Sequence, residues 1–172
     1  FPYTTLFRSG VKAFATAGSE EKCAAIRTLG AEAINYRDQD FAQVIQEKTA
    51  GKGVNVILDI MGGSYLNSNI AALGMEGRLV MLGFLGGAHA KDVDLMAIMS
   101  KRAIVTGSLL RPRTVEEKAS IAEQLREYVW PVLAAGRCLP MIDKVYPLAE
   151  AAQAHARMEG GEHIGKIVLR VD

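Results

Sequence analysis

The stretch GKGVNVILDIMGG, at residues 51–63, decides the fold class of this chain. Its centre, Val54 to Leu58, is an apolar run of strand length that ends at Asp59 and at a glycine turn into a helical pattern. A second apolar run, inside GRLVMLGFLGG at residues 77–87, follows that helix and again ends in glycines. Parallel neighbours need a long crossover connection, and a helix between two strands supplies one. The pattern therefore predicts an α/β fold with a parallel sheet.

The same alternation extends from this stretch in both directions. Apolar, β-rich runs predict strands, and apolar spacings of three and four residues predict helices. The further predicted elements are a strand at 11–16, a helix at 20–29, a strand at 33–36, a helix from 41 that stops near Gly51, a helix at 66–73, a helix at 95–99 and a strand at 103–106. The run from Arg78 to Leu82 is expected to be a buried strand.

The organisation of the chain changes after Arg113. Residues 115–129 have the amphipathic pattern of a long helix, which Pro131 is expected to restart or kink. Two strand candidates, 142–146 and 166–171, then flank a helix at 148–158. This β-α-β ending predicts that residues 10–136 form a nucleotide-binding domain and that residues 137–172 belong to another domain.

Composition narrows the classes of function. With 49% apolar and 23% charged residues, the chain has the balance of a soluble globular protein. A net charge of +1 without a basic block argues against nucleic acid as a partner, and no apolar run approaches the ~18 residues of a membrane span. Cys23 and Cys138 are far apart and lack metal-ligand spacing, which predicts a reducing, cytoplasmic location and no metal site. The histidines have no catalytic partner at a recognisable spacing, so no catalytic residue is predicted.

The N-terminus departs from the rest of the pattern. Residues 2–9, PYTTLFRS, resemble a translated sequencing adapter, so residues 1–9 are interpreted as an artefact; a variable N-terminal extension is the alternative. A GxGxxG phosphate loop, expected before the second strand of a dinucleotide-binding sheet, does not occur in the sequence. We therefore expect a Rossmann-type sheet that lacks its first βα unit; a different fold is the alternative.

The loop after the strand at 11–16 bears on cofactor choice. An acidic residue there selects NAD by binding the ribose 2′-hydroxyl, but this chain has Thr16, Ala17, Gly18 and Ser19. Ser19 and Lys22 would instead bind a 2′-phosphate, which favours NADPH. Ser19 as a simple helix N-cap is the alternative. Tyr36 and Arg37, at the tip of the next strand, would pack on the adenine or contact the phosphate. Further glycines lie at the carboxyl ends of strands, where open α/β sheets bind ligands: Gly62, Gly63, Gly83, Gly86 and Gly87.

Several motifs in order resemble one known family. They are LGAEAINYRDQDF at 29–41, the two stretches quoted above, TGSLLRPR at 106–113 and HIGKIVL at 163–169. Together they resemble the zinc-free NAD(P)H:quinone oxidoreductases related to zeta-crystallin, in the medium-chain dehydrogenase/reductase superfamily. The resemblance implies a two-domain subunit that uses NADPH to reduce a quinone or other electrophilic acceptor, with residues 137–172 returning to a GroES-like catalytic domain.

The resemblance also implies which residues contact the cofactor. Those at the adenosine phosphate are Gly18, Ser19, Lys22 and Tyr36; those beside the adenosine are Met61 and Gly62; those at the nicotinamide are Gly83, Phe84, Leu85, Ser108, Leu109 and Leu110. Because the phosphate loop and the N-terminal domain are not in this sequence, we expect the chain by itself to be inactive.

Other functions and a quaternary structure follow from the same reading. The alternatives are an enoyl reductase or a zinc alcohol dehydrogenase of the same superfamily, or a non-catalytic nucleotide-binding module. The strand at 103–108 carries no charge or proline that would block pairing, so we expect a homodimer formed through this edge. A strand covered by the loop at 111–114 is the alternative.

Overall fold

The structure, a computed structural model, describes residues 11–137 and 139–171. The predicted artefact at residues 1–9 lies outside the described residues. By their internal contacts, the described residues form two compact units. The sheet unit comprises residues 16–18 and 34–120, and the terminal unit comprises 11–15, 19–33 and 121–171. No helix in the described ranges is long and apolar enough to cross a membrane.

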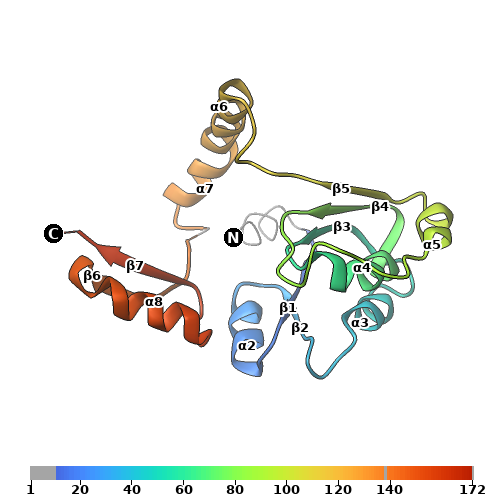
Figure 1. Cartoon of the computed structure of the whole chain (residues 1–172), viewed down its shortest axis with the longest axis horizontal. Coiled ribbons are helices and arrows are strands. Elements are labelled where there is room, and N and C mark those ends of the chain that lie inside the picture. The colour runs from blue at the N-terminus through green and yellow to red at the C-terminus, as the bar shows by residue number, and fades with distance from the viewer. Residues whose placement is uncertain (1–10, 138, 172) are drawn as a thin grey trace. The chain divides into compact units, whose positions relative to one another are not determined.

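A parallel sheet in the order β3-β4-β5 forms the centre of the sheet unit (Figure 1). The strands are β3 (Val54–Asp59), β4 (Leu73–Met81) and β5 (Ile104–Gly107). Both pairs are parallel, and Leu79 of β4 stands between Ile57 of β3 and Val105 of β5. Leu79 is fully buried. The predicted α/β fold with parallel strands is therefore confirmed.

The helices of the sheet unit supply its core. They are α3 (Phe41–Lys48), the 3₁₀ turn η1 (Gly62–Tyr65), α4 (Leu66–Ala72) and α5 (Leu95–Ser100). The α3 helix begins where the Asp40 carboxylate accepts hydrogen bonds from the N–H groups of Ala42 and Gln43. Its Phe41 ring stacks on Tyr65, and Ile70 of α4 is buried beside the sheet.

Two residues of the apolar runs are less buried than their sequence suggests. Val56 of β3 is 57% exposed, although a continuous apolar run predicts burial on both faces. Leu82, expected to end a buried strand, lies just beyond β4 and is 39% exposed. The run of apolar residues marks the strand correctly, but Val56 remains exposed on one face of β3.

A second, two-stranded sheet pairs β1 (Phe14–Ala17) with β2 (Glu32–Asn35) around α2 (Glu20–Thr28). The N–H of Glu32 donates to the Ala13 carbonyl, and the N–H of Tyr36 donates to the Ala17 carbonyl. The second bond lies four residues further along both strands in the same direction, so the strands are parallel. In the doubly wound strand order 3-2-1-4-5-6, strands 2 and 3 are neighbours, and strands 4, 5 and 6 are neighbours. The β1-β2 sheet has the pairing of strands 2 and 3 of that order, and the β3-β4-β5 sheet has the pairing of its strands 4, 5 and 6. The predicted lack of a first βα unit stays a prediction.

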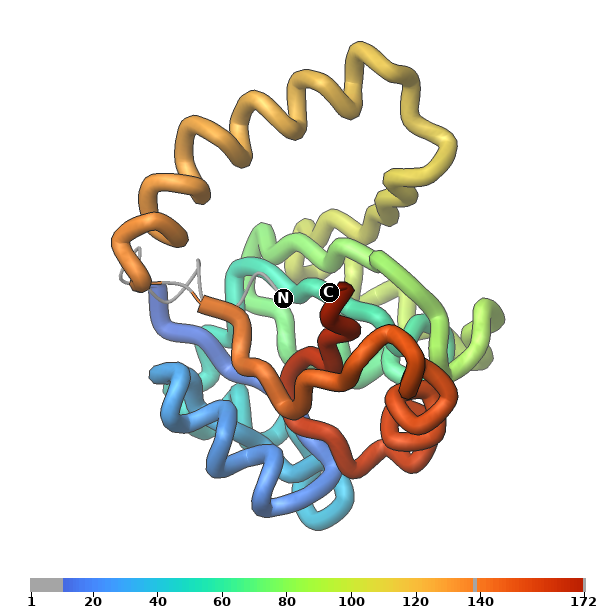
Figure 2. Tube along the Cα trace, turned by 90° about the vertical axis from the view of Figure 1, so that its left-hand side faces the viewer, coloured from blue at the N-terminus to red at the C-terminus, as the bar shows by residue number. Residues whose placement is uncertain are grey.

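The long helical segment after Arg113 changes its winding before the proline, as expected. It consists of α6 (Val115–Gln124), the π-helical segment η2 (Leu125–Val129) and α7 (Trp130–Ala134), which Figure 2 shows as one coil. Pro131 lies in the first turn of α7. Because proline lacks an N–H and its ring crowds the preceding turn, the helix widens to i→i+5 bonding, as from Trp130 N–H to Leu125 O.

The C-terminal part of the terminal unit is a β-α-β motif. Strands β6 (Ile142–Pro147) and β7 (Lys166–Arg170) pair in parallel, and η3 (Leu148–Glu150) and α8 (Ala151–Gly160) connect them. The Asp143 carboxylate binds Arg157 of α8 through two hydrogen bonds of 2.5 and 2.8 Å and also accepts the Ile164 N–H. These bonds hold the pKa of Asp143 down at about 2, chiefly through Arg157. The predicted domain boundary after residue 136 stays a prediction.

Candidate cofactor-binding site

The carboxyl ends of β3, β4 and β5 bring the predicted nicotinamide-side loops to one edge of the sheet. Because the strands are parallel, the segments that begin at residues 60, 82 and 108 all leave from this edge. Backbone hydrogen bonds tie them together: Leu85 N–H to Ile60 O at 2.9 Å, and Ser108 N–H to Met81 O at 3.0 Å. The residues assembled here are Met61, Gly62, Gly83, Phe84, Leu85, Ser108, Leu109 and Leu110.

Asp59 organises the loop after β3. Asp59 is 5% exposed. Its two carboxylate oxygens accept hydrogen bonds from the N–H of Met61 at 3.1 Å and from the N–H of Gly62 at 2.7 Å. A buried carboxylate is tolerated when such bonds replace its hydration. From the sequence, Asp59 was predicted only to end a strand. An aspartate directly before a glycine turn was the available signal, because its side chain readily bonds the backbone two residues on.

Gly62 packs against the glycine-rich loop that follows β4. Its φ is +78°, and an added Cβ would lie 2.7 Å from both Gly87 O and Phe84 Cβ. The N–H of Gly63 donates to the same Gly87 carbonyl at 2.7 Å. Only glycine allows both this backbone conformation and this approach. The predicted role of Gly62 as a cofactor contact is untested, but its role in joining the two loops is visible.

The same edge presents large apolar side chains to its surroundings. Phe84 and Leu85 are 60% and 80% exposed, and Leu109 and Leu110 are 61% and 60% exposed. Side chains of this size and kind line the sites that hold flat organic rings. The edge therefore has the apolar surface that a nicotinamide and an aromatic acceptor would cover.

A second cluster, Gly18, Tyr36 and Arg37, lies at the carboxyl ends of β1 and β2 within the sheet unit. A Cβ at Gly18 would lie 2.5 Å from the Tyr36 hydroxyl oxygen and 3.4 Å from Arg37 Nε. Tyr36 is also near Tyr65, whose pKa is raised first by burial and then by the neighbouring Tyr36 and Asp59. The cluster thus combines an aromatic ring with a guanidinium group, and contact of Tyr36 and Arg37 with an adenine or a phosphate stays a prediction.

Ser19 and Lys22 belong to the terminal unit, where both already have partners. Ser19 is the N-cap of α2: its backbone is extended and its hydroxyl accepts the Lys22 N–H at 3.3 Å. Lys22 Nζ donates to the carbonyl of Gly161, the C-cap of α8, at 2.5 Å. The capping alternative for Ser19 is confirmed. Binding of a 2′-phosphate by Ser19 and Lys22 stays a prediction.

The described residues offer no set of ligands for a zinc ion. Within residues 11–137 and 139–171, no three His, Cys, Asp or Glu side chains gather closely enough to hold a metal. Cys23 is a buried free thiol of α2.

Comparisons with known proteins give consistent relatives. The sequence profile of the family described as zinc-binding dehydrogenase matches residues 29–169. A 2-haloacrylate reductase from a Burkholderia species is 33% identical over 165 residues, which cover 93% of this chain and 48% of that protein. The quinone oxidoreductase of Rattus norvegicus is 30% identical over 162 residues, 93% of this chain and 47% of that protein. The chain spans about half the length of the curated relatives it matches.

Solved structures with the same fold include proteins named as a dehydrogenase and as an enoyl reductase. An NAD-dependent alcohol dehydrogenase superposes with a TM-score of 0.79 at 28% identity, over 99% of this chain and 47% of that chain. A mycobacterial protein solved with NADPH has a TM-score of 0.77 at 25% identity, over 98% and 53% of the chains. The enoyl reductase CurK has a TM-score of 0.74 at 28% identity, over 99% and 50%.

Proposed function

The chain belongs to the zinc-binding dehydrogenase family, among the oxidoreductases of the medium-chain dehydrogenase/reductase superfamily, and we propose that it supplies the cofactor site of an NADPH-dependent quinone reductase. The observation that carries this proposal is the assembly of the loops after β3, β4 and β5 at one sheet edge. That edge is where open parallel sheets bind dinucleotides.

The nicotinamide end of the proposed site is the apolar part of this edge. Phe84, Leu85, Leu109 and Leu110 would cover the faces of the nicotinamide and of the acceptor ring and would exclude water from between them. NADPH supplies a hydride, and a quinone that takes up this hydride and one proton becomes a hydroquinone. Solvent can supply that proton, so the reaction needs the chain to position the two rings rather than to provide an acid.

The adenosine end of the proposed site is the cluster of Gly18, Tyr36 and Arg37. A carboxylate at the tip of β1 would repel a 2′-phosphate, and the sequence has none there. Arg37 Nε is placed to attract an anion near Gly18, and Ser19 follows Gly18 directly in the chain. This charge distribution supports NADPH over NADH.

Reduction of an electron-poor alkene is a second candidate. The Burkholderia relative named a 2-haloacrylate reductase is 33% identical to this chain, against 30% for the quinone oxidoreductase, and an enoyl reductase shares the fold. A carbon–carbon double bond conjugated with a carbonyl can accept a hydride from NADPH, as a quinone does.

We also propose that the functional unit is a homodimer joined through β5. This strand pairs with β4 on one side, and among the described residues no strand pairs with its other side. Ile104 is 45% exposed on it. An open, uncharged edge favours antiparallel pairing with its own copy across a two-fold axis.

Steady-state oxidation of NADPH by the protein expressed from the complete reading frame tests the function. We expect 1,4-naphthoquinone to be reduced faster than 2-chloroacrylate or a crotonyl thioester, and NADPH to be preferred over NADH. Preference for either alkene would favour the second candidate. No oxidation of either nucleotide with any of the three acceptors would contradict both.

A matched pair of variants tests the location of the site. Leu85→Ala removes an exposed leucine from the proposed nicotinamide edge, and we expect the Michaelis constant for NADPH to rise roughly fivefold, from about 1 kcal/mol of lost apolar contact. Leu95→Ala removes a leucine of similar exposure, 66%, from α5 outside the site. It should leave the constant unchanged. Equal effects of the two substitutions would place the cofactor elsewhere.

A further inference from the structure

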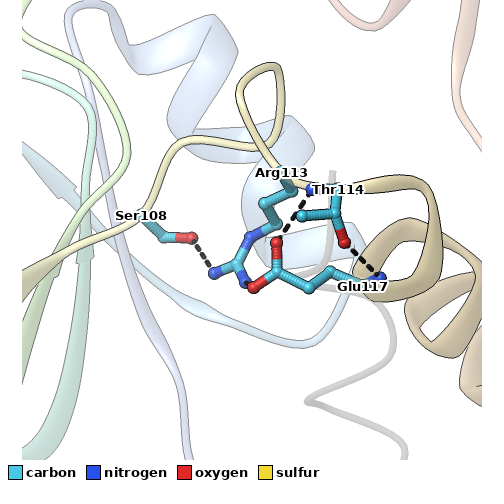
Figure 3. A network of polar contacts seen from close by, with 4 residues as sticks. All are labelled: Ser108, Arg113, Thr114 and Glu117. Carbon is cyan, nitrogen blue, oxygen red and sulfur yellow. Dashed lines mark hydrogen bonds and ion pairs between the residues drawn. The ribbon is translucent and has the colours of Figure 1, made fainter.

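Arg113 joins the end of β5 to the start of α6 (Figure 3). Its Nη2 donates to the Ser108 hydroxyl oxygen at 3.1 Å, and its Nη1 lies 3.5 Å from a carboxylate oxygen of Glu117. Its backbone N–H donates to Leu110 O at 3.3 Å. One side chain thus spans the whole segment Ser108–Arg113, with both ends of the loop attached to it.

The bridge is not needed to start the helix. Thr114 and Glu117 cap α6 reciprocally: the Thr114 N–H donates to the Glu117 carboxylate at 2.9 Å, and the Glu117 N–H donates to the Thr114 hydroxyl at 3.2 Å. The Arg113–Glu117 pair is partly exposed and spaced i,i+4 with the cation first, an arrangement that contributes little by itself. The contact from Arg113 to Ser108 therefore serves the loop rather than the helix.

The contact also determines how the Ser108 hydroxyl can act. A guanidinium group has five N–H donors and no acceptor, so Ser108 must accept from Arg113 and its own hydrogen must point elsewhere. The hydroxyl is left as a donor at the sheet edge that carries Gly83 and Phe84. A carbonyl oxygen is the chemical partner that such a donor suits, whether it belongs to a carboxamide or to an acceptor.

The loop that Arg113 closes carries two of the most exposed leucines of the edge. Leu109 and Leu110 stand between the bridged residues and remain 61% and 60% exposed. Lys118 of α6 fixes the same loop by donating to Arg111 O at 3.0 Å, and Ser108 N–H is bonded to Met81 O. These hydrogen bonds hold the loop so that Leu109 and Leu110 stay exposed, where a ligand could contact them, instead of packing onto the core.

We propose that Arg113 is a positioning residue, which acts through Ser108 to orient a hydroxyl donor toward a ligand carbonyl and to hold Leu109 and Leu110 at the nicotinamide edge. The inference rests on the proposed function. Under this proposal Ser108 is not only a residue near the nicotinamide but a hydrogen-bond donor whose direction Arg113 determines.

Hydrogen exchange on the protein without ligand tests the loop independently of catalysis. In Arg113→Met we expect the Ser108 and Arg113-position amides to exchange roughly tenfold faster, the effect of losing one hydrogen bond to a charged group. Arg111→Met is the matched control, because this arginine lies in the same loop and, among the described residues, the Ser108 hydroxyl is bonded by Arg113 and not by Arg111. Equal exchange in both variants would overturn the inference.

Kinetics on the protein from the complete reading frame test the role of Ser108, with rates normalised to NADPH-binding sites. Arg113→Met should lower kcat roughly tenfold through misplacement of the ring and leave the Michaelis constant for NADPH within about twofold. Ser108→Ala alone should lower kcat at least as much as Arg113→Met does, and the double variant Ser108→Ala/Arg113→Met should lose no more than Ser108→Ala, because the two residues act as one unit. Additive losses would contradict action through Ser108.

Two further outcomes separate this inference from the proposed function. Arg113→Lys keeps the positive charge but loses the planar set of guanidinium N–H donors. Full activity of this variant would show that orientation of the Ser108 hydroxyl by the guanidinium is unnecessary. A wild-type protein that oxidises NADPH while Arg113→Met is indistinguishable from Arg111→Met overturns the inference and leaves the function intact. A wild type that oxidises no nucleotide refutes the proposed function, and the exchange experiment then decides the role of Arg113 in the loop.

Discussion

Replacement of Gly62 by alanine is the sharpest stability test that the structure offers. The new methyl group would lie 2.7 Å from Gly87 O, 2.7 Å from Phe84 Cβ and 2.9 Å from Phe84 Cα. Backbone atoms account for two of these contacts, so rotation of a side chain cannot relieve them. The loop after β4 must therefore move away from the loop after β3 to admit the methyl group.

The cost has two parts, which a second glycine separates. Gly62 and Gly51 have almost the same φ, +78° and +76°, but a Cβ at Gly51 would meet nothing within 4 Å. Gly51→Ala should therefore cost about 1 kcal/mol for the left-handed backbone alone. Gly62→Ala should cost that amount plus about 1–3 kcal/mol for overpacking, or about 2–4 kcal/mol in total.

Urea unfolding followed by far-ultraviolet circular dichroism measures both free energies. Trp130, the one tryptophan of the sequence, lies in the terminal unit, so its fluorescence reports whether that unit is affected. We expect the loss in Gly62→Ala to exceed the loss in Gly51→Ala clearly, and NADPH binding to weaken only in Gly62→Ala. Equal free energies of unfolding for the two variants would refute the close packing of the two loops.

Three other predictions concern charge and assembly. Lys22→Ala should raise the Michaelis constant for NADPH roughly tenfold and leave that for NADH unchanged, because only the former loses a charged hydrogen bond; an unchanged NADPH constant would show that Lys22 serves Gly161 alone. The pKa of Asp143 falls from 3.8 to about 2 on folding, so the stability it adds is complete above pH 3.8 and disappears as the pH falls through 2. Acid titration should show that Asp143→Asn lacks this loss, and an unaltered acid transition would contradict a structural role for the pair with Arg157. Val105→Pro removes one backbone donor from β5 and should give monomers by light scattering, whereas a variant that stays dimeric would exclude this edge as the interface.

Local pattern was sufficient for the type and order of most elements of this protein, but it did not place residues 73–77 in β4, which begins at Leu73. The apolar run Val54–Leu58 and the run around Leu79 predicted β3 and β4, and the helix between them predicted their parallel pairing. Parallel pairing in turn places the glycines after both strands at one edge. Such features depend on residues close together in the sequence, since periodicity and turn chemistry act over a few residues.

Tertiary structure alone decided which residues at that edge depend on one another. Gly62 must be glycine because of Phe84 and Gly87, which β4 brings back from more than twenty residues away. Lys22 meets Gly161 only because α2 and the end of α8 belong to one unit. These contacts have no sequence signature, because they join segments whose separation along the chain is closed by the crossover connections of the fold. The sequence by itself therefore determined most of the strands and helices and the edge at which we propose a cofactor binds, and packing between distant segments determined how that edge is held in shape.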